Sequence, residues 1–245
     1  DFERYVRPAN ALLERLLRDG RTNILFCGRV APNKRLEDLI KVTFYYKKYI
    51  SPLVRLVVVG KTSSLPVYYR SLVRLASEFH LEAEEVRFLG HVPDEDLYAA
   101  YRAADVFLSL SEHEGFCLPL VESLVFDVPV VAYDSTAVPD TLGGAGVLVR
   151  DKRVDRLAEL VDAVAHDPAL RSKLIAGQRA PVFVHARGDD LDTPLPPSRL
   201  PDLVAGGVRL GDQRVQTTVA HAPAHPGFRQ QTAQHVHRGQ ISIAE

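Results

Sequence analysis

The chain has 245 residues, 46% of them hydrophobic and 25% charged, which is typical of a globular protein with a substantial core. Its formal net charge of -1 argues against nucleic acid as a partner, and no apolar run approaches the length of about 18 residues that a membrane span requires, so we expect at most peripheral membrane contact. Two cysteines, Cys27 and Cys117, are too few for a disulfide framework or a zinc site and favour a reducing, cytoplasmic setting.

The chain contains no methionine and opens without a signal-peptide pattern, so we expect a piece of a longer protein. Residues 1–20 are predicted to form a lead-in helix or inter-domain linker, and strand-like and helix-like blocks alternate over 21–177. The hydrophobic pattern predicts strands and helices, in chain order, as follows: strand 23–28, helix 36–49, strand 54–60, helix 67–80, strand 86–90, helix 94–103, strand 105–109, helix 119–126, strands 128–132 and 146–149, and a last helical region over 154–176.

This alternation of short strands and longer helices indicates βαβ units around a parallel sheet. The strands are continuous Val/Leu runs rather than alternating ones, which favours a sheet that is covered on both faces. We therefore predict an α/β fold, a Rossmann-like parallel sheet with helices on both faces.

Residues 178–245 differ in character from the rest of the chain. They contain several prolines but no lysine, tyrosine or asparagine, and their hydrophobic periodicity largely vanishes. We expect an irregular or disordered tail. His235 and His237 have no further ligands near them in the sequence, so we predict no metal site there.

The candidate functional residues follow the strands, and ligands of open α/β sheets bind beyond the carboxyl ends of the strands. Two glutamates, Glu114 and Glu122, flank a segment in which Pro119 suits the first turn of a helix. Residues 115–118 would then form a turn with free backbone N–H groups, which attract a phosphate or a sugar hydroxyl. The alternative is that both glutamates are solvated residues at a helix start.

Two cations, Arg29 and Lys34, follow the first strand, where both could contact a diphosphate. The alternative is that they are ordinary solvated loop residues. After the third strand, the backbone beyond Gly90 could hydrogen-bond a nucleotide base.

Taken together, these motifs resemble those of the family-4 retaining glycosyltransferases. The resemblance covers about residues 20–177, the family's C-terminal nucleotide-sugar-binding domain, which is one half of a GT-B fold. It rests on successive motifs in the right order: Gly28-Arg29 with Lys34, 88–90 with 92–93, 104–109, Glu114-Gly115-Phe116 with Leu118, Pro119 and Glu122, 129–131, and 138–139 with 143–147.

The resemblance implies a role for each matching residue. Arg29, Lys34 and Glu114 would be catalytic: the two cations would clamp the donor diphosphate, and Glu114 would hold hydroxyls of the transferred sugar. Glu122 would bind the ribose, and Val92 would meet the base through its main chain. The implied donor-binding set comprises Gly28, Val92, Gly115, Phe116, Cys117, Leu118 and Glu122.

The resemblance also implies a hexosyltransferase that uses a UDP- or GDP-linked sugar, needs no metal or other cofactor, and retains the anomeric configuration. An acceptor sugar or lipid would be held by the absent N-terminal domain, so the isolated domain is expected to be inactive or weakly active. The sequence departs from the family's pattern at Cys117 and Asp127, which stand where glycine is frequent, and at Asp140, which replaces a glutamate.

Other interpretations compete with this one. A non-catalytic nucleotide- or sugar-binding module would use the same pocket without transfer. A nicotinamide dehydrogenase is disfavoured, because the segment after Gly28 lacks the expected Gly-x-Gly-x-x-Gly pattern. Cys117 could be a nucleophile beside His113, but a structural cysteine is the favoured interpretation.

Overall fold

The computed structural model describes Tyr5 and residues 7–178. The tail predicted for 178–245 lies outside the described residues except for Gln178, which ends a helix. The prediction about His235 and His237 also falls outside them.

Six parallel strands form one sheet in the order β3-β2-β1-β4-β5-β6. Their bounds are β1 (Thr22–Cys27), β2 (Val54–Val59), β3 (Val86–Gly90), β4 (Val106–Ser109), β5 (Val130–Tyr133) and β6 (Val147–Val149). The chain therefore starts in the middle of the sheet, builds one half outward to β3, and returns beside β1 to build the other half. This order places the switch point, where ligands bind in such sheets, between β1 and β4.

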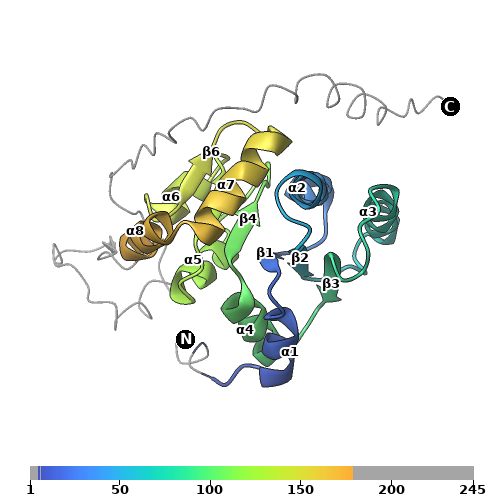
Figure 1. Cartoon of the computed structure of the whole chain (residues 1–245), viewed down its shortest axis with the longest axis horizontal. Helices are drawn as coiled ribbons and strands as arrows, with labels where there is room; N and C mark the ends of the chain where they lie inside the picture. The colour runs from blue at the N-terminus through green and yellow to red at the C-terminus, as the bar shows by residue number, and fades with distance from the viewer. Residues whose placement is uncertain (1–4, 6, 179–245) are drawn as a thin grey trace. The chain divides into compact units, whose positions relative to one another are not determined.

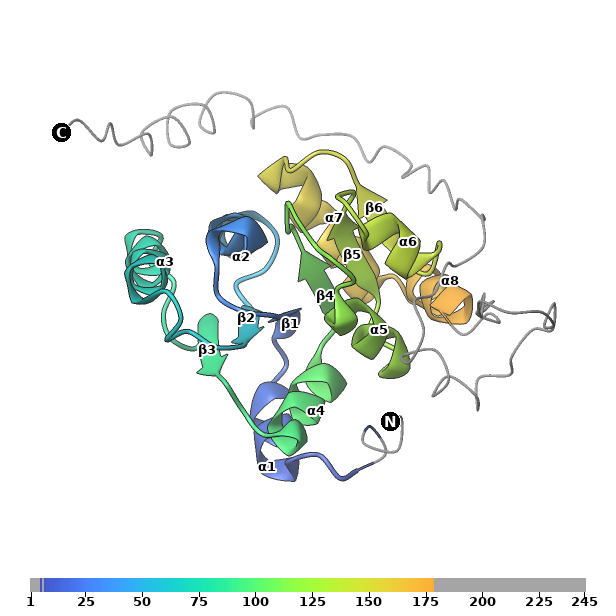
Figure 2. The same cartoon turned by 180° about the vertical axis from the view of Figure 1, so that it is seen from behind.

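Helices cover both faces of the sheet, and the predicted Rossmann-like architecture is confirmed (Figure 1). Their bounds are α1 (Ala11–Leu17), α2 (Leu36–Tyr49), α3 (Pro66–Glu78), α4 (Asp94–Ala103), α5 (Leu118–Val125), α6 (Val138–Leu142), α7 (Val154–His166) and α8 (Pro168–Gln178). Helices α2, α3 and α7 pack on one face, and α1, α4, α5 and α6 on the other. From behind, α5 and α6 are seen together beside β5 (Figure 2).

The central strands are apolar throughout because both of their faces are covered. Every residue of β1 and β2 is buried. Ile24 and Phe26 contribute to the core under α2 and α7, whereas Leu25 and Cys27 point to the core under α4 and α5. This two-sided burial explains why the sequence shows continuous apolar runs.

The predicted helices over 36–49 and 94–103 have the bounds expected. The helical region predicted over 154–176 consists of two helices, α7 and α8, with Asp167 between them. Asp167 precedes Pro168, and a residue before proline disfavours the helical conformation. Its carboxylate instead accepts the N–H groups of Ala169 and Leu170 and caps α8.

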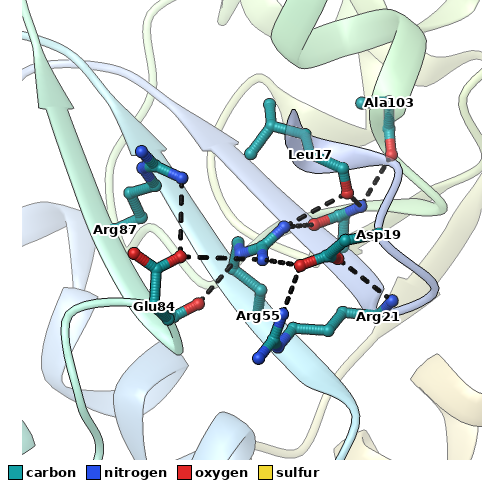
Figure 3. A network of polar contacts seen from close by, with 8 residues as sticks. Leu17, Asp19, Arg21, Arg55, Glu84, Arg87 and Ala103 are labelled. Atoms are coloured by element: carbon teal, nitrogen blue, oxygen red, sulfur yellow. Dashed lines mark hydrogen bonds and ion pairs between the residues drawn. The ribbon is translucent and has the colours of Figure 1, made fainter. Parts of the chain in front are cut away.

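A buried arginine ties four segments together where β1 and β2 begin (Figure 3). The side chain of Arg55 is 0% exposed. Its guanidinium donates to the carbonyls of Glu84 and Leu17 at 2.9 and 3.1 Å, to Asn23 Oδ1 at 3.2 Å, and to Asp19 Oδ2 at 2.6 Å. The pKa of Asp19 lies below its usual value, because the hydrogen bond and charge of Arg55 outweigh the opposing effect of burial.

At the opposite edge, where β1 and β2 end, the chain passes so closely that glycine is required. Gly60 has a φ of +147°, and a Cβ placed on it would lie 1.9 Å from the carbonyl oxygen of Gly28. The two strand ends are held by hydrogen bonds from Gly28 N–H to Val59 and from Gly60 N–H to Gly90. This packing fixes where the loop after β1 begins.

Candidate functional site

Three loops meet at the carboxyl edge of the sheet, after β1, β4 and β5. The loop after β4 contacts the loop after β1 through the N–H of Glu112, which donates to the carbonyl of Asn33 at 2.9 Å. It contacts the loop after β5 through Ser135 Oγ, which donates to the carbonyl of Ser111 at 2.7 Å. The candidate residues after β1 and β4 are therefore neighbours in space.

The strongest feature of this edge is an ion pair between Lys34 and Glu114. Lys34 Nζ lies 2.6 Å from Glu114 Oε2, and the two side chains are 15% and 8% exposed. Lys34 lies in a 3₁₀ turn, Pro32–Lys34, that leads into α2. The pairing and the burial contradict the alternatives that Lys34 is a solvated loop cation and that Glu114 is a solvated residue at a helix start.

Arg29 lies on the same loop but differs from Lys34. Its side chain is exposed, and it forms no ion pair or hydrogen bond with the residues that the structure describes. The structure therefore does not bring it to Glu114, and its contact with a diphosphate stays a prediction. An exposed guanidinium at this edge is chemically able to make such a contact.

The segment after Glu114 leads directly into α5. Cys117 adopts a left-handed conformation with φ of 58°, Leu118 is the first residue of α5, and Pro119 follows in the first turn as expected. Among the described residues, the backbone N–H groups of Gly115, Phe116 and Cys117 have no hydrogen-bond partner. The predicted turn with free N–H groups is thus present, and it lies beside a helix N-terminus, where the dipole favours an anion.

Hydroxyl side chains from the segment after β5 and from α6 bind the same loop. Thr136 Oγ1 accepts the N–H of Glu114 and donates to the carbonyl of Glu114, each at 2.8 Å. Thr141 Oγ1 donates to the carbonyl of Phe116 at 2.6 Å. The carbonyls of Glu114 and Phe116 are therefore held by protein hydroxyls, whereas the N–H groups of Gly115, Phe116 and Cys117 have no partner among the described residues.

Glu122 is buried, which contradicts the alternative that it is a solvated residue. Its two carboxylate oxygens accept hydrogen bonds from the hydroxyl of Tyr5 at 3.0 Å and from that of Tyr101 at 2.9 Å. The ring of Tyr101 stacks on Phe126, with centroids 5.1 Å apart. The predicted contact of Glu122 with a ribose stays a prediction, and it requires the ribose to share or replace one of these hydroxyls.

Cys117 is unsuited to nucleophilic catalysis. Burial, with a further contribution from the charge of Glu114, raises the pKa of its thiol to about 12. A thiol with such a pKa is almost entirely protonated at neutral pH, and the thiolate is the reactive form. The interpretation as a structural cysteine is therefore supported over that of a nucleophile beside His113.

The predicted base-binding segment lies beyond β3. Val92 is half-buried and packs against the core that α4 and α5 cover. Gly28, at the end of β1, would bring a Cβ within 3.1 Å of the ring of Phe26, so this position is tight. Contact of Gly28 with the donor and of the Val92 main chain with a base stay predictions.

Several residues of this site were not identified from the sequence. They are Tyr5, Tyr101, Ser135, Thr136 and Thr141. A signal existed for Ser135 and Thr136, because they follow β5 at its carboxyl end, whereas Thr141 lies within α6. No signal existed for Tyr5, whose partner Glu122 is 117 residues away.

Two kinds of feature are absent from the described part of the chain. No group of three or more His, Cys, Asp or Glu side chains lies together there as a metal site would require. None of the helices of this part has both the length and the apolar character for crossing a membrane.

Comparison with known families gives one match over most of the described chain. Residues 13–180 match the model of the family described as glycosyl transferases group 1. The match includes all of the site residues named above except Tyr5 and ends within two residues of the last described position.

A curated relative is the GDP-mannose-dependent monoacylated alpha-(1-6)-phosphatidylinositol monomannoside mannosyltransferase of Corynebacterium glutamicum. It is 30% identical over 172 residues, which is 66% of this chain and 42% of that enzyme. The chain spans less than half the length of the curated relatives that it matches.

Two solved structures share the fold. Anabaena HepE in complex with UDP and glucose superimposes with a TM-score of 0.62 at 21% identity, over 73% of this chain and 48% of that one. The C-terminal domain of the glycosyl transferase group 1 family protein LpcC from Francisella tularensis gives 0.59 at 22% identity, over 71% of this chain and 93% of that one. Identities this low establish the shared fold alone.

Proposed function

Because the chain belongs to the group 1 family of glycosyl transferases, we propose that it is the donor-binding half of a retaining, family-4 enzyme with a GT-B fold. In this proposal it binds a nucleotide-diphosphate sugar at the carboxyl edge of the sheet. The Lys34–Glu114 ion pair carries the proposal, because it places a cation and an acceptor of hydroxyl hydrogen bonds side by side. A sugar nucleotide presents the complementary pair of groups, because its phosphate is bonded directly to a sugar that carries hydroxyl groups.

The pair can bind both parts of the donor without being broken. A lysine ammonium has three N–H donors, of which Glu114 uses one, so others remain for phosphate oxygens. Arg29 would add a second positive charge from the exposed side of the loop. The N–H groups of Gly115 and Phe116, which have no partner among the described residues, would complete the anion site.

The sugar would be held by the second oxygen of Glu114. Oε2 of this carboxylate is bonded to Lys34, and the thiol of Cys117 also hydrogen-bonds to the carboxylate, which has further lone pairs for a ligand. A carboxylate on a side chain that is largely buried is a strong acceptor for a sugar hydroxyl. The position of the sugar hydroxyls relative to the diphosphate would then be set by one side chain.

Lys34 and Arg29 also suit the chemistry of transfer. When the bond between the sugar and the diphosphate breaks, negative charge grows on the leaving phosphate, and fixed cations stabilise that charge. We propose that these two side chains supply the stabilisation without a metal ion and that the acceptor attacks on the face the diphosphate leaves. The acceptor would be bound by a second domain, since half of a cleft neither orients it nor excludes water.

The names of the relatives suggest two donor classes. The corynebacterial relative is GDP-mannose-dependent, and the Anabaena structure holds UDP and glucose. We propose a UDP- or GDP-linked hexose as the donor of this chain. Direct titration decides between the two bases.

The test is calorimetric titration of this chain with UDP, GDP, UDP-glucose and GDP-mannose in the presence of EDTA. We expect saturable binding of one nucleotide and its sugar conjugate. Lys34→Met should weaken both by about tenfold or more, because it removes the buried cation and leaves Glu114 unpaired. Lys173→Met is the matched control, because Lys173 is exposed on α8, and it should leave binding unchanged.

A folded chain that binds none of the four ligands would overturn the proposal. Equal loss of affinity in Lys34→Met and Lys173→Met would also contradict the site, since it would show a general effect of charge. Circular dichroism of each variant establishes that the fold is intact.

A further inference from the structure

The loop that carries Glu114 has little packing of its own. A Cβ placed on Gly115, the next residue, would meet nothing within 4 Å, so this part of the loop borders open space. Phe116 is 37% exposed. The position of the Glu114 backbone must therefore be held from outside the loop.

Thr136 provides that hold. Its hydroxyl accepts the N–H of Glu114 and donates to the carbonyl of the same residue, so a single oxygen clamps both polar groups of the Glu114 backbone. Ser135 and Thr141 each bind one carbonyl elsewhere in the segment, at Ser111 and Phe116. Thr136 is the hydroxyl residue of this segment that contacts Glu114.

The backbone of Thr136 is in an unfavourable conformation. Its φ is 42°, in the left-handed region, which a β-branched residue seldom adopts. Such a conformation persists only where the surroundings enforce it, and it is concentrated at functional sites. Asparagine or glycine would fit this backbone with less strain, but glycine has no oxygen with which to hold Glu114.

From this geometry we propose that Thr136 is a positioning residue that sets sugar recognition. This inference rests on the proposed function. By fixing the backbone of Glu114, Thr136 directs the carboxylate toward Lys34 on one side and toward the sugar on the other. In the proposed function, the cations that face the diphosphate and the backbone that faces the base lie on the loops after β1 and β3, and only the N–H groups of Gly115 and Phe116 come from the clamped loop. The bare nucleotide should therefore depend less on this clamp than the sugar does.

The test compares a sugar nucleotide with its bare nucleotide. This chain and three variants, Thr136→Val, Thr136→Gly and Thr136→Ser, are titrated with UDP, GDP, UDP-glucose and GDP-mannose. Thr136→Val keeps the shape and branching but removes both hydrogen bonds, and Thr136→Gly removes them while relieving the backbone. Thr136→Ser retains the hydroxyl and is the matched rescue variant.

We expect Thr136→Val and Thr136→Gly to weaken the sugar nucleotide about tenfold, the equivalent of two ordinary hydrogen bonds, and the bare nucleotide less than about twofold. Thr136→Ser should keep the affinities of the original chain. Thr136→Gly keeps the test decisive if Thr136→Val does not fold.

Two results would overturn the inference: equal weakening of sugar nucleotide and bare nucleotide, which indicates a structural role, or unchanged affinities in the glycine variant. Failure of the proposed function gives a different result, because the original chain would then bind none of the four ligands.

Discussion

The ion pair between Lys34 and Glu114 allows both charged side chains to be largely buried. A carboxylate that is 8% exposed is costly to bury unless it is paired and hydrogen-bonded. Lys34 supplies the pairing, and Glu114 in turn allows a lysine to lie largely buried at the site where we propose that a phosphate binds. The pair is thus both structural and available to a ligand, because each group retains unused hydrogen-bonding capacity.

The two cysteines allow a prediction at the same scale. Burial raises the pKa of Cys117 to about 12 and raises that of Cys27 as well, so neither thiol should be ionised near neutral pH. We expect iodoacetamide to label the folded chain slowly and to label both thiols rapidly in urea. Mass spectrometry of the alkylated chain measures this, and fast stoichiometric labelling of folded Cys117 would restore the interpretation as a nucleophile.

Glu122 shows why a motif residue can be placed correctly and still leave its role open. The sequence predicts it inside a helix after a strand, and it lies within α5. However, both of its oxygens accept hydrogen bonds from tyrosine hydroxyls, one of them from Tyr5 in the segment before α1. Any ribose contact is therefore coupled to the position of that segment.

At the scale of elements, the close approach of strand ends shapes the site. The loop after β1 passes over Gly60, and this loop carries Arg29 and Lys34. Gly177, in contrast, lies within α8, and a Cβ placed on it would meet nothing within 4 Å. Substitution of Gly177 is therefore a suitable control for substitution of Gly60.

We predict that Gly60→Ala destabilises the fold by about 3 kcal/mol or more, since the new methyl group overlaps a backbone carbonyl at an unfavourable φ. Gly177→Ala should instead stabilise it by about 0.5–1 kcal/mol, as alanine does within helices. Urea denaturation followed by circular dichroism measures both. Similar effects of the two substitutions would show that the close approach at Gly60 is absent.

At the scale of the whole molecule, the two edges of the sheet carry different kinds of structure. The carboxyl edge carries the loops with the candidate site. At the opposite edge, the hydrogen bonds and ion pair of Arg55 connect several segments (Figure 3). Because its guanidinium binds Leu17, Asp19, Asn23 and Glu84, the arginine joins the end of α1, the start of β1, β2 and the loop before β3. The network around Arg55 and the proposed ligand site therefore lie at opposite edges of the sheet.

We predict that Arg55→Met lowers the free energy of unfolding by about 3–5 kcal/mol, because it leaves buried polar partners unpaired. Arg74→Met is the control: its side chain is 72% exposed, and loss of its pair with Glu78 should cost about 1 kcal/mol or less. Urea denaturation of both variants measures this difference, and equal effects would contradict the structural role of Arg55.

The same network gives a pH dependence. The pKa of Asp19 is lower in the folded chain than the ordinary value of 3.8, so its carboxylate stabilises the fold above that value. The contribution is lost as the pH falls through the lower pKa of the folded state. The difference between the original chain and Arg55→Met should therefore shrink in this acidic range, and a difference that grows there would be inconsistent with the pairing.

The sequence alone determined the alternation of strands and helices, the parallel sheet, and the edge at which Arg29, Lys34 and Glu114 would lie. Hydrophobic periodicity and turn residues are local, so they specify element type and the face that is buried. They also placed Pro119 at the start of α5 and left the N–H groups of residues 115–117 in a turn. The break at Asp167 was legible in principle from Pro168, but the continuous pattern concealed it.

Only the tertiary structure decided which side chains meet. Lys34 and Glu114 are 80 residues apart, and Thr136 contacts Glu114 across 22 residues through a backbone conformation that its residue type disfavours. Such contacts depend on the order of strands in the sheet and on the directions of side chains at their ends. Neither is specified by a local pattern, which is why the sequence predicted only the edge of the sheet that carries the candidate residues, whereas the fold determined how their charges are paired and positioned.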